Sequence, residues 1–596
     1  MDLAIESNDK LNIGDLLGNR NPFVIPKHQR AYSWEKDNVE TFCDDIEKIN
    51  GEYFFGGIVS VHQFANNGPG RIFRVVDGQQ RLVTFTLLLT CLKEAFERVV
   101  ELSKNPNNKE TAKTMAEQIG SNYLFYIDTK EKPPVRKNRL TLSRVDDAFF
   151  SRLLKNEPFE LQNIESHKKL ETAKRTIKEK LIDKIFNEND NEEEIIEGLQ
   201  KIHDNILDRT VVIHIVCNNI DEAYQLFEVL NDRGQELAVG DHLRSHTLER
   251  LEGFASEQED IARYWDEILS NKKAEAFLKA YLTSQEPKAK KRGLHKEYFR
   301  YVFGKELDPL AIGEKVRHMY RMFEVFDAIE SGSWPYTNSR VTGWEKQRLE
   351  LLVNHLKHHA CIPMLLTVYN YGNEEDFSMV VHETEKVVFR YISAMQARAN
   401  RLTSLYTKMI SLTRDNKSFD IKNYLSELQS FVGNYCDDGK FAEALNTNLV
   451  YNNKNIKKVR YLLLTIEYFF KSYTKDMNFV PSPCKDVIYS IDQIQIEHIY
   501  PQNPKTRSAD MEKLKNNLGN LSFWSPSDNW KASNKHFLEK RNSYQRSNVA
   551  ITRELYNYPD WNSTTIDERQ QFIVEISKRI FSINANVLVN NGAGVQ

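Results

Sequence analysis

The stretch RIFRVVDGQQRLVTFTLLLTCLKEAF, residues 71 to 96, restricts the possible folds of this chain more than any other. It begins with the alternation of a β-strand and continues, after Asp77-Gly78, as a long apolar helix. The preceding stretch YFFGGIVSVHQF has a second strand pattern, so the two strands predict a β-hairpin that leads into a buried helix. A later run, RTVVIHIVC, predicts another buried strand. The N-terminal region is therefore expected to be a mixed α/β domain.

The Asp77-Gly78 turn also brings functional groups together. Arg81 lies on the first turn of the predicted helix, near backbone N–H groups that have no partner within the helix. Such an arrangement can bind an anion. No GxxxxGKS or GxxxxGKT sequence is present, which excludes a conventional P-loop. A strand-to-helix turn without a ligand is the alternative interpretation of the same residues.

Polar and aromatic side chains also gather in the segment PKHQRAYSW, which contains Gln29, Arg30, Tyr32 and Trp34. Arg30 could pair with a phosphate, and Tyr32 or Trp34 could stack on a base. The alternative is a structural clamp between a strand and the following helix. The residues alone leave both interpretations open.

A second informative stretch runs from Ile494 to Tyr544. Glu497 and His498 close an apolar alternating run, Asn520 opens a short second strand, and Asn529 follows nine residues later. An enzyme that cuts phosphodiesters needs a cation at the phosphate and a base for a water. Histidine suits the base, and carboxylate and amide oxygens suit Mg²⁺. The pattern predicts a one-metal nuclease site, with an ordinary strand end before Pro501 as the alternative.

The local charge agrees with a nucleic-acid partner. Between Lys505 and Asn548 there are nine Lys or Arg residues against four Asp or Glu, in a chain whose net charge is −3. A locally basic surface is what binding of phosphates requires, although a solvated helix face could carry the same excess. The side chains expected to contact DNA are Lys531, Lys535 and Arg541.

The length of 596 residues indicates about two to four domains. A hydrophobic content of 40 % supports packed cores. The six cysteines form no CxxC spacing, which favours a reduced, cytoplasmic protein without a disulfide framework or a cysteine zinc site. The sequence has neither a signal segment nor a run of about 18 apolar residues, so secretion and membrane spanning are not expected.

The elements EHIxPQ, GNL, SDN and a trailing FxxK resemble the HNH, or ββα-metal, endonucleases. The resemblance implies a strand that ends at Glu497-His498, a second strand from Asn520, and a helix that starts between Asn529 and Ser533 and includes Lys540. Asparagine in place of histidine at the third position favours Mg²⁺ or Mn²⁺ over Zn²⁺. The roles that it implies are His498 as general base, Glu497 and Asn529 as metal ligands, Asn520 as the brace of the loop that carries the base, and Lys540 as a supporting residue.

The elements IPxxQRxYxW, FFGGIV, VDGQQRLVT and FEVLNDRGQELAVGDHL lie within about residues 10 to 250 and resemble the DGQQR domain of GmrSD-type modification-dependent restriction enzymes, which include the SspE proteins. This resemblance implies a ParB nuclease-like core that hydrolyses a nucleoside triphosphate (GTP, ATP or UTP) and so controls a C-terminal HNH nuclease. Asp77 could hold Mg²⁺ or orient water, and Arg81 could offset the charge of a phosphoryl group. The nucleotide-binding residues that it implies are Gln29, Arg30, Asp77, Gly78, Gln79, Gln80, Arg81, Asn231 and Arg233.

The sequence therefore predicts an α-rich α+β protein of several domains. Residues 1–250 would form the ParB-like NTPase domain with a helical insertion, 251–480 a helical middle domain, 481–586 the HNH domain, and 587–596 an unstructured tail. The predicted function is an NTP-regulated, metal-dependent endonuclease or nickase that restricts foreign, phage double-stranded DNA according to its modification. The alternatives are a DNA-modification sensor whose nuclease is vestigial or that recruits a partner effector, and an NTPase switch. The sequence leaves a homodimer open.

Overall fold

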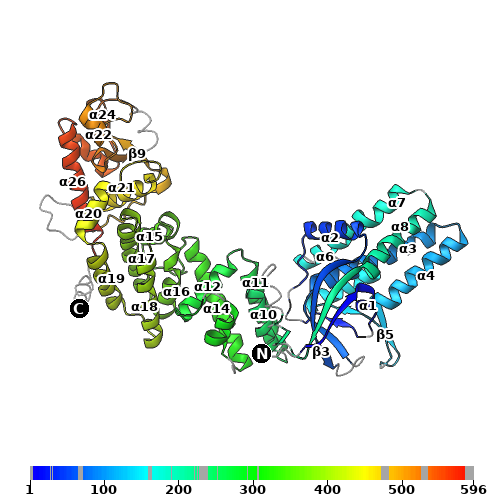
Figure 1. Cartoon of the computed structure of the whole chain (residues 1–596). Helices are drawn as coiled ribbons and strands as arrows, with labels where there is room; N and C mark the ends of the chain where they lie inside the picture. Colours follow the sequence, from blue (N-terminus) through cyan, green and yellow to red (C-terminus); the bar gives the residue numbers. More distant parts are fainter. Residues whose placement is uncertain are drawn as a thin grey trace. The chain divides into compact units, whose positions relative to one another are not determined.

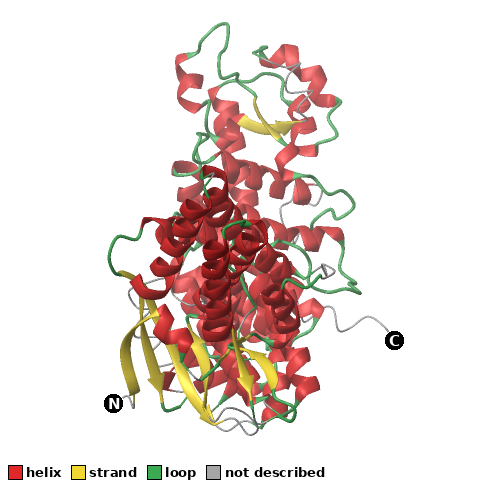
Figure 2. Cartoon of the chain, turned by 90° about the vertical axis from the view of Figure 1, so that its right-hand side faces the viewer, coloured by secondary structure: helices red, strands yellow, loops and turns green. Residues whose placement is uncertain are grey.

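The computed structural model describes the chain in two compact units, Met1–Trp265 and Asp266–Gln596. Helices predominate (Figures 1 and 2). In the part of the chain that the structure describes, the strands form one mixed sheet and two short pairs. Among the residues described, none of the helices combines the length and the apolar composition needed to span a bilayer. The described residues are 5–19, 21–26, 29, 31–64, 71–129, 131–158, 164–189, 191–219, 222–223, 226, 239–251, 253–290, 293–304, 308–470, 482–524 and 534–583.

The first unit is built on a six-stranded mixed sheet. Its order is β1 (Ile5–Asn12), β8 (Thr210–Cys217), β3 (Tyr53–Phe64), β4 (Arg71–Asp77), β2 (Phe23–Val24) and β7 (Leu140–Thr141). The central strand β3 is antiparallel to β4 and parallel to β8. The predicted hairpin and the predicted buried strand are both confirmed.

The long helix α3 (Gln79–Leu102) forms the centre of this unit. Its residues from Leu82 to Leu92 are buried without interruption, which explains why this segment is apolar on every face. It packs against α4 (Pro106–Ile119), α6 (Glu165–Ile177) and α8 (Glu192–Asp204). The unit also contains α1 (Ile13–Gly18), α2 (Lys36–Lys48), the hairpin β5 (Phe125–Asp128) and β6 (Val135–Asn138), α5 (Arg144–Lys155), α7 (Asp183–Glu188) and α10 (Val239–Arg250), and α11 (Ala255–Ser270) crosses into the second unit.

The second unit is largely helical. Helix α16 (Ile362–Tyr371) packs against α12 (Ala274–Gln285), α14 (Pro309–Glu330), α17 (Glu374–Val387) and α18 (Asn400–Asn416), and α17 packs against α19 (Ile421–Tyr435). Further along the chain follow α20 (Asp438–Thr447) and α21 (Ile456–Phe470). The helical patterns expected between residues 251 and 480 are thus observed in its described parts.

A short antiparallel strand pair lies near the C-terminus of this unit, formed by β9 (Gln495–His498) and β10 (Leu521–Trp524). It shares one hydrophobic core with α20 and α21, and with α26 (Ser563–Ile580). The helix that carries Lys540, α24, extends over Phe537–Gln545, with α25 (Ala550–Arg553) after it. Residues Asn534 to His536 are not helical, so the prediction that one helix runs from residues 529–533 through Lys540 is wrong. The His536 N–H donates to Glu539, which fixes the start of α24 at this point.

One glycine in β3 controls the packing between the sheet and α3. The register of β3 with β8 shifts between Phe54 and Gly57, and Gly56 has a φ of +106°. A methyl group on Gly56 would collide with the guanidinium of Arg81. The first glycine of the FFGG sequence, Gly56, therefore leaves the space in which the Arg81 side chain lies.

We predict that Gly56→Ala destabilises the protein more than Gly51→Ala. Both positions have positive φ, but nothing lies within 4 Å of a Cβ on Gly51. Gly51→Ala should cost about 1–2 kcal/mol for its backbone conformation, and Gly56→Ala at least about 1 kcal/mol more, because the Arg81 guanidinium must move. Urea denaturation measures both free energies of unfolding. Equal losses for the two variants would contradict this packing.

Candidate functional site

The C-terminal candidate site begins at the end of β9, where Glu497 and His498 are both buried. Oε1 of Glu497 accepts hydrogen bonds from Nζ of Lys540 at 2.6 Å and from the hydroxyl of Tyr544 at 2.8 Å. Lys540 also donates to the backbone carbonyl of His498 at 2.9 Å. Helix α24 is therefore joined to β9 by a buried ion pair and two added hydrogen bonds.

The burial of this ion pair determines its energetics. The side chain of Lys540 is inaccessible and that of Glu497 is 4 % exposed. Burial lowers the pKa of Lys540, and the neighbouring carboxylate of Glu497 opposes that shift. Because neither charge is hydrated, each is stabilised mainly by the opposite charge of the other. The pair thus keeps the carboxylate in one position beside His498.

Asn520 fixes the loop that follows His498. Its Oδ1 accepts from the Tyr500 N–H at 2.7 Å and from the Trp561 indole N–H at 3.0 Å. Its Nδ2 donates to the carbonyls of Tyr500 at 3.0 Å and Lys515 at 2.8 Å. These four bonds use both hydrogens and both lone pairs of a completely buried amide. The loop from His498 to Tyr500 is therefore held rigidly against β10.

The His498 imidazole has its own set of neighbours. The ring of Tyr451 meets it edge to face, with centroids 4.6 Å apart. Nε2 of His498 lies 3.4 Å from Nε2 of Gln502. Burial lowers the pKa of His498 to about 4, although a hydrogen bond with the Asn516 side chain opposes this shift. The imidazole is therefore neutral near pH 7 and able to accept a proton.

Sequence reasoning did not identify Tyr451, Asn516 or Tyr544 as part of this site. Tyr451 precedes α21, far from the Glu497-His498 pair in the sequence, and no local pattern connects them. Tyr544 is four residues after Lys540, so it lies on the same face of α24. That spacing is the one signal in the sequence that could have indicated its role.

The remaining predicted residues of this region differ in their surroundings. Lys535 is exposed before α24. Arg541 donates from Nε to the carbonyl of Tyr556 at 2.9 Å, and its guanidinium lies over the Tyr556 ring. Arg541 thus makes contacts within the protein. Asn529 and Lys531 lie outside the residues described.

Of the two residues predicted to bind a metal ion, Glu497 lies among the described residues, and carboxylate oxygens suit a hard, hydrated cation. Within the described ranges, no group of three or more His, Cys, Asp or Glu side chains could hold a metal ion. Mg²⁺ and Mn²⁺ differ from structural zinc, because they keep several waters and need few protein oxygens. Lys540 and Tyr544 both bind Oε1 of Glu497, so Oε2 is the oxygen that would face a cation.

The N-terminal candidate site lies at the turn between β4 and α3. Gly78 has a φ of +91°, which lets the chain turn directly from Asp77 into the helix. Nη2 of Arg81 lies 3.1 Å from Oδ2 of Asp77, and Nη1 donates to the Phe55 carbonyl at 3.4 Å. The Arg81 and Asp77 side chains are 23 % and 24 % exposed. An acid and a guanidinium are therefore accessible beside a helix N-terminus.

The predicted glutamines have largely structural partners. Nε2 of Gln29 donates to the carbonyls of Val75 at 2.9 Å and Val76 at 3.0 Å. Oε1 of Gln80 accepts from the Ser33 N–H at 2.9 Å. Both side chains are buried, so they tie the segment after β2 to β4 and α3.

Gln79 remains partly exposed beside this segment. Three further residues predicted for the nucleotide site, Arg30, Asn231 and Arg233, lie outside the described part of the chain. Asp77, Gly78 and Arg81 are therefore the predicted nucleotide-site residues that the structure brings together at this turn.

Two family models match this chain. The model of the GmrSD restriction endonuclease N-terminal domain matches residues 13–248, and the model of the GmrSD restriction endonucleases C-terminal domain matches residues 435–576. The protein is therefore a restriction nuclease, a class that acts on DNA. More narrowly, the chain belongs to the GmrSD-type modification-dependent restriction endonucleases, which confirms the predicted family. A search of the curated proteins found no match.

We predict that removing Lys540 is more harmful than removing a nearby exposed lysine. Lys540→Ala leaves the Glu497 carboxylate buried without its cation and should cost about 3–5 kcal/mol of unfolding free energy. Tyr544→Phe removes one hydrogen bond and should cost about 1–2 kcal/mol. Lys535→Ala is the matched control, with an effect within about 0.5 kcal/mol. Urea denaturation would contradict the account if Lys540→Ala behaved like the control.

Proposed function

We propose that the chain is an HNH-type, metal-dependent DNA endonuclease or nickase whose reacting groups are Glu497 and His498. The observation that carries this proposal is the fixed, buried arrangement of the two side chains. Lys540 holds the carboxylate, and Asn520 holds the loop that begins at the imidazole. The match to restriction endonuclease models at both ends of the chain supports it.

The proposed roles follow from the charge state of each group. His498, whose pKa is lowered to about 4, takes a proton from the attacking water as general base. Glu497, and by resemblance Asn529, would hold a Mg²⁺ or Mn²⁺ ion, which supplies charge neutralisation at the scissile phosphate when bound. Lys540 and Tyr544 keep Oε1 of Glu497 engaged and thereby leave Oε2 for the cation.

In the N-terminal unit, we propose a ParB-like site that hydrolyses a nucleoside triphosphate and regulates cleavage. Arg81 would offset the charge of the transferring phosphoryl group, and Asp77 would orient water or a metal ion. The accessible Asp77–Arg81 pair at the start of α3 supports this assignment, since free N–H groups of a helix N-terminus attract phosphate. Foreign DNA in the cytoplasm would then be cut according to its modification.

His498→Ala should abolish plasmid nicking in the presence of Mg²⁺, with a loss of about 100-fold or more, because the general base is removed. His203→Ala on α8 is the control and should nick normally. For the wild type, kcat/KM should begin to fall only as the pH drops to about 4, the pKa of His498. The reason is that the imidazole can no longer accept a proton once it is protonated. An unchanged rate for His498→Ala, or an acid limb near the pKa of a free histidine, would contradict the proposal.

Arg81→Ala should abolish hydrolysis of the nucleoside triphosphate while the fold and DNA binding are retained. Arg98→Ala is a matched control, because Arg98 lies on the same helix α3 but pairs with Asp183 at 3.8 Å. Phosphate release is measured with GTP, ATP and UTP in turn, with and without DNA. If the wild type hydrolyses none of them, or if Arg81→Ala hydrolyses as fast as the wild type, the N-terminal assignment is wrong.

A further inference from the structure

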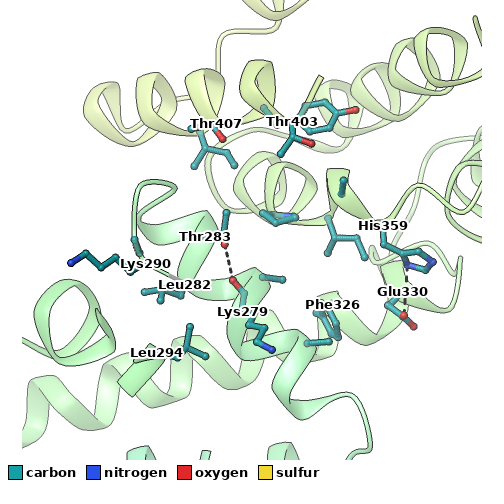
Figure 3. Close-up of a pocket in the computed structure, with 18 of the residues that line it drawn as sticks. Lys279, Leu282, Thr283, Lys290, Leu294, Phe326, Glu330, His359, Thr403 and Thr407 are labelled. Carbon is teal, nitrogen blue, oxygen red and sulfur yellow. Dashed lines mark hydrogen bonds and ion pairs between the residues drawn. The ribbon is translucent and has the colours of Figure 1, made fainter. Parts of the chain in front are cut away.

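A large cavity lies within the second unit and is separate from the Glu497-His498 site. It is open to solvent on one side and lined mainly by α12, α14, α16 and α18, and its volume is about 770 Å³; Figure 3 shows it in close-up. This volume lies in the range of sites that bind small molecules or single chemical groups of larger ligands. Nothing in the proposed cleavage chemistry uses this cavity, so it is available for another role.

The lining divides into an apolar part and a polar part. Leu282, Phe326 and Ile362 are among the apolar side chains. The polar part comes mainly from α18, where Asn400, Thr403 and Thr407 recur about one turn apart. Figure 3 shows Thr403 and Thr407 on this side of the cavity, across from Thr283 of α12. The hydroxyls of Thr283 and Thr403 donate to backbone carbonyls of their own helices. Their lone pairs can therefore accept hydrogen bonds from a ligand.

The charges around the cavity are mostly paired within the protein. Lys279 pairs with Glu275, and Glu330 pairs with Lys273. The carboxylate of Glu330 also lies 3.7 Å from His359, as the close-up shows. A ligand group inside this cavity would therefore be electrically neutral, with a flat or apolar part and polar substituents that donate hydrogen bonds.

A basic segment, of which the structure describes residues 286–290 and 293–300, forms one edge of the cavity through Ala289, Lys290 and Leu294. Both of its acidic residues are engaged: Glu286 pairs with Arg414 at 3.1 Å, and Glu297 accepts from the Lys290 N–H at 2.9 Å. Among the described residues of the segment, the exposed basic side chains include Lys288, Lys290 and Arg300. A ligand with a neutral group inside the cavity and phosphates outside it would match this distribution of charge.

We propose that the cavity receives a modified nucleotide extruded from duplex DNA, with the base and its neutral polar substituent inside and the flanking phosphates against residues 286–290 and 293–300. This inference rests on the proposed function, because it assigns the reading of the modification to a site within that nuclease. An enzyme that must inspect a base substituent gains full access to it by turning the nucleotide out of the stack. Apolar side chains then contact the ring, and the threonine and asparagine groups contact the substituent.

The test fills the cavity without altering its charged edge. Thr407→Trp places an indole in the cavity, and Ser404→Trp is the matched control, because Ser404 lies exposed on the same helix and does not line the cavity. A second variant, Thr403→Val, removes one hydroxyl at nearly constant volume. The probes are short duplexes with methylcytosine, hydroxymethylcytosine or hexosylated hydroxymethylcytosine, and the unmodified duplex. Fluorescence anisotropy measures affinity, and circular dichroism verifies the fold.

The wild type and Ser404→Trp should bind at least one modified duplex about tenfold or more tightly than the unmodified duplex, which is the size of effect expected for recognition of one base. Thr407→Trp should reduce this preference to about one, and Thr403→Val should reduce it in part, while all four proteins bind the unmodified duplex equally. If Thr407→Trp folds and keeps the full preference, or if the wild type has no preference for any probe, the inference is wrong.

Two further measurements separate the possible failures. Plasmid nicking with Mg²⁺ tests the proposed function separately: if the wild type prefers a modified duplex but nicks neither modified nor unmodified plasmid, the proposed function has failed and the cavity assignment has not. The corresponding modified nucleoside monophosphates test a free ligand. If they bind the wild type tightly and Thr407→Trp abolishes that binding while the preference between duplexes remains, then the cavity binds a free nucleotide and the assignment to extruded DNA is wrong.

Discussion

The ion pair between Glu497 and Lys540 is the interaction on which the C-terminal site depends. Two buried charges are costly, and here the cost is offset by close pairing and by hydrogen bonds from Tyr544 and to the His498 carbonyl. The same contacts join the end of β9 to α24. A carboxylate held in this way has little freedom to move, which suits the proposed role of presenting one oxygen to a hydrated cation.

Local patterns predicted much of the fold. The hairpin of β3 and β4, the buried strand β8, the strand pair around His498 and Asn520, and the family were all readable from short motifs. Contacts between segments that are distant in the sequence could not be predicted from such motifs. Tyr451 reaches His498 from before α21, and Gln29 binds the backbone of β4, because the tertiary fold brings these segments together. The start of α24 was placed too early, since His536, rather than an earlier residue, precedes the helix.

In the N-terminal unit, the proposed nucleotide site involves a guanidinium that already has partners. Arg81 now interacts with the carboxylate of Asp77 and the carbonyl of Phe55, in space left by Gly56. A phosphate that binds Arg81 has to compete with both oxygens, so occupancy of the proposed nucleotide site would change the contacts between α3 and β3.

The most direct test of the central claim is a titration with Mn²⁺ followed by electron paramagnetic resonance, in the wild type and in Glu497→Gln. This substitution keeps the size of the side chain and removes the charge that would anchor the cation. The account predicts a Mn²⁺ site in the wild type that is lost or strongly weakened in Glu497→Gln. Equal binding of Mn²⁺ by both proteins, or no binding by the folded wild type, would contradict the assignment of Glu497 as a metal ligand.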